Sequence, residues 1–247
     1  MSTPSTSLER VELAVSDGTT MFAEIVRPAA VRGTAPGIIV FQDAYGVNDQ
    51  LREIAQRLAG LGLVAIAPEL YHRTQPHLVG AYDGRDDALR NRGKDDLTPA
   101  GTIADVRAAY DWLAREPSVA TDRIAAIGFC MGGRTVFTAN AEVPLRAGIS
   151  FYGGGIAPGL LDRAPEQHGR LLMFWGGRDK HILAEHRRAV DDALTAAGKD
   201  HIQVTFSRAE HGFFGHQQPA YDADSAQNAW ALAVEFLRVS GVVTAAP

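Results

Sequence analysis

One cysteine stands in a sequence pattern that can present a nucleophile. Residues 127–133 read IGFCMGG, so Cys130 lies between Gly128 and Gly132 at the end of a short apolar run. This is the G-x-S-x-G pattern of a nucleophile elbow, with cysteine in place of serine. Glycines permit a sharp strand-to-helix turn because they lack the Cβ atoms that would clash there. The thiol would lie at the N-terminus of the next helix, whose dipole favours a thiolate.

A lone cysteine is more commonly a small buried hydrophobic residue than a nucleophile. Here the cysteine joins a predicted buried strand to a predicted helix, and this context favours the nucleophile. We therefore predict that Cys130 is catalytic, and simple burial of its side chain is the alternative.

An acid and a base follow later predicted strands, in the order that such an elbow requires. Asp179 comes after the strand predicted at residues 171–175, and His211 comes after the strand predicted at 201–207. His211 would accept the thiol proton, and Asp179 would orient the imidazole and stabilise its charged form. A turn role for Asp179 and a capping role for His211 are the alternatives.

The positions of two segments relative to Cys130 also predict an oxyanion site. One oxyanion donor is predicted to be the backbone N–H of Met131, and the other to come from the loop at residues 42–46, QDAYG.

Three histidine pairs are spaced five residues apart, which does not place both rings on one helix face as a metal site on a helix would require. They are His72/His77, His181/His186 and His211/His216. We expect no metal site.

Composition excludes several classes of protein. The chain has 247 residues, and 24 basic against 29 acidic residues give a net charge of −5, which argues against a nucleic-acid or anionic-membrane partner. A single cysteine excludes an intramolecular disulfide. The N-terminus lacks the basic and apolar regions of a secretory signal, and no apolar run approaches the ~18 residues of a membrane span. We expect a soluble cytoplasmic protein, either a monomer or a small homo-oligomer.

The elements that must position these residues alternate between strand and helix. Residues 8–15 and 20–27 predict a hairpin, and 1–7 are expected to be frayed. This alternation predicts a mostly parallel central sheet with helices on both faces, in one α/β domain over 1–247. Strands are expected at 37–41, 63–67, 123–129, 145–151, 171–175 and 201–207, and helices at 49–60, 102–114, 131–141, 184–197 and 221–238.

One segment interrupts the alternation. Residues 72–99 are rich in Asp, Arg, Gly and His and poor in aliphatic residues. We interpret them as an excursion that could cap the site as a lid, with a solvated surface loop as the alternative.

Several motifs together resemble the dienelactone hydrolase family, within the α/β-hydrolase fold, from about residue 8 to 238. They are FQDAYGVN at 41–48, PELY at 68–71, GFCMGG at 128–133, GGRD at 176–179, HGF at 211–213 and the C-terminal segment 221–237 with its Ala226 and Trp230. The cysteine at the elbow is the most specific feature, because most relatives in this fold carry serine. The resemblance implies hydrolysis of an enol-lactone, such as dienelactone to maleylacetate, without a cofactor.

The resemblance also implies roles for individual residues. Cys130 would be the nucleophile, His211 its base and Asp179 the partner of the base, with the N–H groups of Ala44 and Met131 forming the oxyanion site. The family places a Glu, which helps to activate the thiol, where this chain has Asp43. Asp43 is therefore a candidate catalytic residue, or else a loop cap. Predicted substrate contacts are Tyr45, Phe129 and Phe213.

A second departure concerns substrate charge. The family member that hydrolyses dienelactone has an Arg a few residues after the catalytic His, whereas this chain reads FFGH at 213–216. We expect a more apolar mouth, with Arg85, Arg90 or Arg92 of the excursion as possible substitutes. The leading hypothesis is an ester or enol-lactone hydrolase with an acyl-cysteine intermediate. The alternatives are a broad carboxylesterase or thioesterase, and a binding or redox-sensing protein with little turnover.

Overall fold

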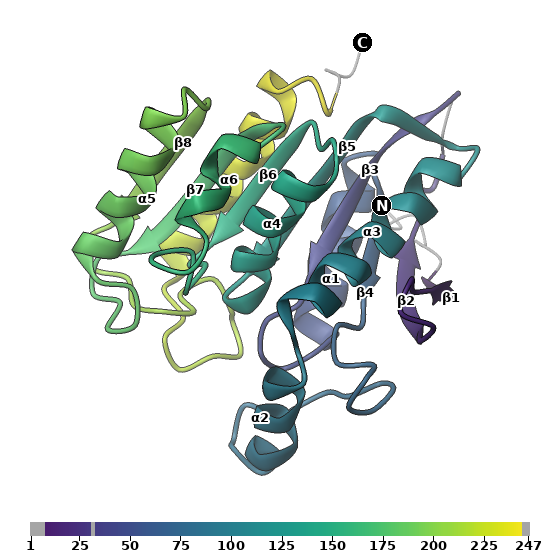
Figure 1. Ribbon diagram of the computed structural model, residues 1–247, viewed down its shortest axis with the longest axis horizontal. Coiled ribbons are helices and arrows are strands. Elements are labelled where there is room, and N and C mark those ends of the chain that lie inside the picture. Colours follow the sequence, from purple (N-terminus) through teal and green to yellow (C-terminus); the bar gives the residue numbers. More distant parts are fainter. Residues whose placement is uncertain (1–7, 31–32, 244–247) are drawn as a thin grey trace, which may run out of the picture.

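The structure, a computed structural model, describes residues 8–30 and 33–243, so the predicted frayed segment 1–7 lies outside the described residues. Its strands form an 8-stranded sheet in the order β1-β2-β4-β3-β5-β6-β7-β8 (Figure 1). The strands β1 and β2 and the strands β2 and β4 pair antiparallel, and the other neighbours pair parallel. The bounds are β1 Leu8–Ala14, β2 Thr20–Val26, β3 Ala35–Phe41, β4 Val64–Pro68, β5 Val119–Phe129, β6 Ala147–Phe151, β7 Arg170–Gly176 and β8 His201–Phe206.

Helices cover both faces of this sheet, which confirms the predicted fold class. In Figure 1, α3, α4 and α5 lie in front of the sheet and α6 lies behind it. Within residues 8–30 and 33–243, no helix has the length and apolar character needed to cross a membrane. The helices are α1 Asp49–Gly60, α2 Asp87–Asp95, α3 Pro99–Arg115, α4 Met131–Glu142, α5 Ala184–Ala196 and α6 Ala223–Val239, with a 3-10 turn, η1, at Leu161–Glu166.

Alternation of side chains along the central strands builds two hydrophobic clusters. Ile38 and Val40 of β3 pack in the cluster that contains α1, whereas Ile39 and Phe41 pack in the one that contains α3. Every residue of β3, β4 and β6 is buried. Continuous apolar runs therefore mark strands that are covered on both faces. The predicted strands and helices are confirmed, with their ends shifted by a few residues.

The excursion at residues 72–99 contains α2, which the sequence did not predict. Only Gly93 of this helix is buried, so no apolar stripe reveals it. Gly93 packs on the ring of Tyr71, and a Cβ on Gly93 would lie 2.9 Å from that ring. The helix projects from the end of the sheet at the bottom of Figure 1.

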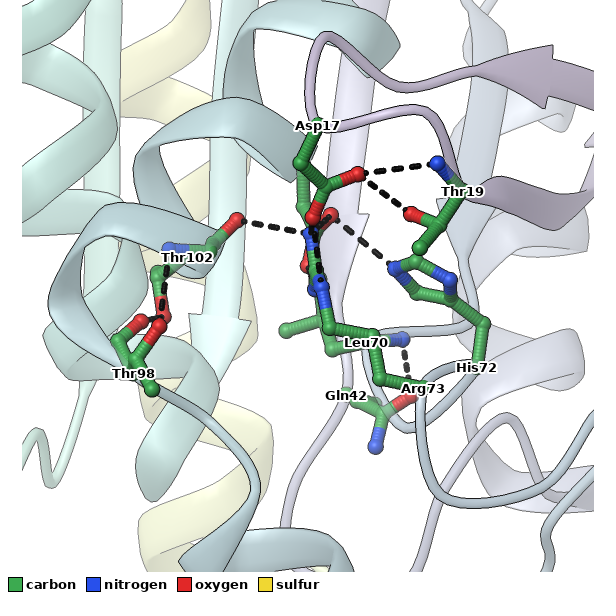
Figure 2. A network of polar contacts seen from close by, with 10 residues as sticks. Asp17, Thr19, Gln42, Leu70, His72, Arg73, Thr98 and Thr102 are labelled. Carbon is green, nitrogen blue, oxygen red and sulfur yellow. Dashed lines mark hydrogen bonds and ion pairs between the residues drawn. The ribbon is translucent and has the colours of Figure 1, made fainter.

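A polar network around the buried Asp105 fixes the start of the excursion (Figure 2). Nε2 of His72 lies 3.0 Å from Oδ1 of Asp105 on α3, and Arg73 donates to both oxygens of Asp105 at 2.8 and 2.9 Å. Arg73 also donates to Asp17 in the β1–β2 turn at 2.9 Å. Just before them, the N–H of Leu70 donates to Oε1 of Gln42 at 3.0 Å. The network therefore ties the excursion to α3, to the hairpin and to the loop after β3.

Candidate active site

Cys130 lies at the tight turn between β5 and α4, and its backbone is strained. Its φ is +55°, a left-handed value that is rare for a residue with a side chain. Close backbone packing maintains this turn. A Cβ on Gly128 would lie 2.2 Å from the carbonyl oxygen of Gly132, and one on Gly132 would lie 2.4 Å from that of Phe41. Glycine is therefore required at both positions for β5, α4 and β3 to meet.

The structure brings Cys130, His211 and Asp179 together, although they are far apart in the sequence. Asp179 follows β7 and His211 follows β8, so both loops leave the sheet at the same edge as Cys130. Nε2 of His211 lies 3.1 Å from Sγ of Cys130, and Nδ1 lies 2.8 Å from Oδ2 of Asp179. The other oxygen of Asp179 accepts the backbone N–H groups of His181 and Ile182 at 2.8 and 3.1 Å. Both nitrogens of the imidazole are thus within hydrogen-bonding distance of a partner, and two backbone N–H groups fix the carboxylate that orients the ring.

The electrostatics of this chain favour a charged imidazole. Burial alone would lower the pKa of His211, but hydrogen bonds and charges from Asp179 and Cys130 together outweigh burial and raise it to about 10. Burial would likewise raise the pKa of Asp179, but His211 and the two N–H donors hold it below its ordinary value. A protonated imidazole beside the sulfur is the natural partner of a thiolate.

The loop after β3 lies beside the sulfur. Ala44, Tyr45 and Met131 line the same cavity as Cys130, and its volume is about 610 Å³. The hydroxyl of Tyr71 donates to the carbonyl of Ala44 at 3.2 Å and lies 3.6 Å from the sulfur of Met131. One tyrosine therefore joins the two segments from which oxyanion donors were predicted. A second cavity, of about 600 Å³, lies between β1 and α3, far from these side chains.

Asp43 is a buried carboxylate at the wall of this cavity. Its Oδ1 accepts the N–H of Tyr45 at 2.8 Å, and its Oδ2 accepts from Nε2 of Gln218 at 3.1 Å. Burial raises the pKa of Asp43 to about 6, and the Tyr45 N–H, the Tyr82 hydroxyl and the charge of Arg90 only partly offset it. The loop-cap role is thus present in the hydrogen bond to Tyr45.

This raised pKa predicts that Asp43→Asn stabilises the protein in a pH-dependent manner. The pKa of Asp43 in the folded state lies above its ordinary value of 3.8, so folding favours the protonated side chain. The resulting stabilisation is fully present below pH 3.8 and is lost as pH rises through about 6. At pH 8 the buried carboxylate would cost up to about 3 kcal/mol, so the variant should gain about 1–3 kcal/mol there. Below pH 4 it should gain almost nothing. Urea unfolding at both pH values measures this difference, and an equal gain at both would contradict it.

Three Arg and Lys side chains also line the cavity, and of these only Arg90 was among the possible substitutes that the sequence offered. They are Arg90 and Lys94 of α2 and Arg134 of α4. The guanidinium of Arg90 lies over the ring of Tyr45, 4.9 Å from its centroid, and donates to Asp87 at 2.8 Å. Its Nε is buried and has no hydrogen-bond partner among the described residues. Arg85 instead pairs with Asp83, outside the cavity.

Two predicted substrate contacts are wrong. Phe129 and Phe213 are 1% and 0% exposed and do not line the cavity. Phe129 stacks on Phe151 with ring centroids 4.8 Å apart, and Phe213 packs edge-on against Tyr152 at 5.3 Å. Both rings belong to the hydrophobic core, in which their side chains are almost completely buried. The expected apolar mouth is therefore replaced by a charged one, whereas Tyr45 does line the cavity.

Sequence reasoning also missed Gln218 and His181, which complete the wall. The ring of His181 lies edge-on to that of His211, with centroids 5.3 Å apart. Neither residue belongs to a recognisable motif, so only the folded loops reveal them. Among the described residues, no group of three His, Cys, Asp or Glu side chains is arranged to hold a metal ion.

The mostly parallel sheet, the tight turn at Cys130 and the acid and histidine after later strands define an α/β hydrolase. Comparison with known proteins supports the same class of protein. The model of the dienelactone hydrolase family matches residues 21–240, and the chain belongs to this family. It is a hydrolase that acts on small-molecule substrates.

Relatives and solved structures resemble the chain over most of its length. Proteins provisionally named carboxymethylenebutenolidase are 32% identical in Synechocystis sp. and 31% identical in Yersinia pestis, covering 83% and 92% of this chain and 86% of each relative. The crystal structure of a provisionally named dienelactone hydrolase from Klebsiella pneumoniae has a TM-score of 0.82 at 27% identity, covering 94% of this chain and 98% of that one. A promiscuous phosphotriesterase of dienelactone-hydrolase type, from metagenomic libraries, has a TM-score of 0.77 at 26% identity, covering 93% and 97%.

Proposed function

We propose that the chain hydrolyses carboxylic esters or enol-lactones through an acyl-cysteine formed on Cys130. The observation that carries the proposal is the continuous chain of short contacts from Asp179 through His211 to Sγ. The thiolate attacks the carbonyl carbon and forms a C–S bond. The tetrahedral oxyanion collapses, the C–O bond breaks, and the leaving oxygen takes a proton from His211. Water then gives a proton to His211 and attacks the thioester, which releases the acid and regenerates the thiolate.

The oxyanion would be stabilised by backbone N–H groups of Ala44 and Met131. Both residues line the cavity beside Cys130, and Tyr71 connects the segments that carry them. Donors that are fixed before the reaction stabilise developing charge without reorganising, which is typically worth about 3 kcal/mol per donor. In an enol-lactone the leaving enolate is stable enough to depart without the proton of His211, and it stays tethered to the acyl group. It can help to deprotonate the hydrolytic water, and this favours enol-lactones over simple esters.

Trapping the acyl-enzyme tests this function. We expect wild-type protein quenched during turnover of an enol-lactone or an aryl ester to gain the mass of the acyl group on the peptide containing Cys130. Cys130→Ala should show neither the adduct nor turnover. Turnover of aryl esters without lactone preference would support the broad carboxylesterase or thioesterase. A reactive thiol with no turnover of any ester, thioester or lactone would support the binding or redox-sensing protein instead.

The cavity lining includes three Arg and Lys side chains, Arg90, Lys94 and Arg134, and these favour a substrate that carries an acidic group. Arg90 is oriented by Tyr45 and Asp87, and its buried Nε has no partner among the described residues. A guanidinium can bind a carboxylate through two parallel hydrogen bonds. We therefore propose that Arg90 receives the carboxylate of an acid-bearing lactone, in the place of the Arg that is missing after His211.

Replacing Arg90 by Ala is expected to raise KM about tenfold or more for a lactone that bears a carboxylate, because one charge-assisted contact is lost. KM for a neutral aryl ester should change less than about threefold. Arg85→Ala is the matched control, since Arg85 is exposed, pairs with Asp83 and does not line the cavity. Steady-state kinetics on both substrates measure the difference, and equal effects on the two would contradict carboxylate recognition.

A further inference from the structure

The side chain of Gln218 connects the loop that carries His211 to the loop after β3. Gln218 follows His211 by seven residues and reaches across the cavity wall, where its Nε2 donates to Oδ2 of Asp43 at 3.1 Å. The other carboxylate oxygen of Asp43 accepts the N–H of Tyr45 at 2.8 Å. A continuous hydrogen-bonded path therefore runs from the histidine loop, through Asp43, to the backbone next to Ala44.

The histidine loop is shaped around this glutamine. A Cβ on Gly212 would lie 2.2 Å from Oε1 of Gln218, and one on Gly215 would lie 2.8 Å from Nε2. Successive turns hold the backbone, because the N–H of Gly215 donates to Gly212, and that of Gln218 donates to Gly215, at 3.0 and 2.9 Å. The carboxamide thus occupies a defined space between two glycines, and it is aimed at Asp43.

Gln218 donates to Asp43 without bringing a charge. The charged and titratable groups around Asp43 come from several elements, namely Arg90 of α2, His211, and the phenols Tyr45, Tyr71, Tyr82 and Tyr152. Gln218 is among the direct hydrogen-bond donors, and a carboxamide stabilises a carboxylate less than a cation would. Asp43 can therefore gain and lose its proton near neutral pH.

We propose that Gln218 is a positioning residue for the hydrolase reaction, which holds ionised Asp43 in place and thereby fixes the Ala44 loop relative to His211. The inference rests on the function proposed above. In this role, a neutral side chain keeps the loop after β3 and the loop that carries His211 in a fixed relative position. It also makes the reaction sensitive to the ionisation of Asp43, because protonation would replace the charged acceptor of this bond by a weaker neutral one.

Three variants test this inference with a neutral aryl ester, whose own charge does not change with pH. Gln218→Ala removes the donor, so the acidic limb of the kcat/KM profile should move up by about one pH unit, with kcat falling more than KM changes. Gln218→Lys introduces a cation, so the limb should move down by about one pH unit or more. Gln217→Ala is the matched control, because this neighbouring glutamine is exposed, and it should leave the profile unchanged.

A direct titration separates this inference from the proposed function. The carboxyl carbon of Asp43, identified by carbon-13 NMR as the signal missing in Asp43→Asn, should titrate at higher pH in Gln218→Ala and at lower pH in Gln218→Lys. Opposite shifts in the two variants support the inference, and unmoved titrations in both would overturn it. If wild-type turnover proves independent of Cys130, the proposed function fails, while the Asp43 titration can still be measured. Should Gln218→Ala not fold, Gln218→Lys alone decides by the sign of its shift.

Discussion

Replacing His211 by Asn is expected to lower kcat/KM for an enol-lactone by about ten-thousand-fold. The variant keeps a polar side chain of similar size but loses the base that lies 3.1 Å from Sγ of Cys130 and 2.8 Å from Asp179. Without the imidazole, nothing in the contact chain can accept the thiol proton or return it to the leaving group. Losses of this order are typical when one member of a catalytic triad is removed.

A double variant measures whether Cys130 and His211 act as a unit. Cys130→Ala combined with His211→Asn should lose little more activity than either single variant, because each already disables the same step. His168→Asn is the control, since this histidine is exposed and lies outside the cavity. Multiplying losses in the double variant, or near wild-type rates in His211→Asn, would show that the contacts do not form a catalytic unit.

Replacing Gly132 by Ala is expected to destabilise the fold by about 3 kcal/mol or more. The new Cβ would lie 2.4 Å from the carbonyl oxygen of Phe41 and 2.5 Å from that of Gln42. Both obstacles are backbone atoms at the end of β3, so they can move away only if α4 separates from the sheet. The loss would be a large fraction of the stability of a typical domain. Urea unfolding at pH 7 measures it.

Gly60 provides the matched control for this substitution. It ends α1, and a Cβ built on it meets nothing within 4 Å. Gly60→Ala should therefore change the free energy of unfolding by less than about 1 kcal/mol, in the stabilising direction. If both variants unfolded at the same urea concentration, the close packing around the Cys130 turn would not be a major source of stability.

The sheet and its helices could be predicted because local pattern and burial agree. Continuous apolar runs such as residues 37–41 became strands with every residue buried, and stripes such as Leu51, Ile54 and Leu58 became the buried side of α1. Once strands are placed in parallel, residues that follow them lie at one edge. This rule placed Asp179 and His211 near Cys130 without any knowledge of distances.

The rest of the cavity could not be predicted because it depends on tertiary structure. Helix α2 has one buried residue, so its existence and the inward position of Arg90 leave no periodic signal. Phe129 and Phe213 neighbour site residues in the sequence, but a strand alternates its faces, and a turn can direct a ring into the core. The contact between Gln218 and Asp43 joins residues 175 positions apart, and no motif marks it.

The cavity is lined by residues from two parts of the fold, and this separates the reacting groups from the groups that select the substrate. The reacting groups, Cys130, Asp179 and His211, follow strands of the sheet. The cations Arg90 and Lys94 instead belong to the excursion between β4 and α3. An exchange of the excursion could consequently retune which compounds are accepted while the reacting atoms keep their geometry. Chimeras in which residues 74–97 are replaced by the corresponding segment of a relative would show whether substrate preference is transferred with the excursion.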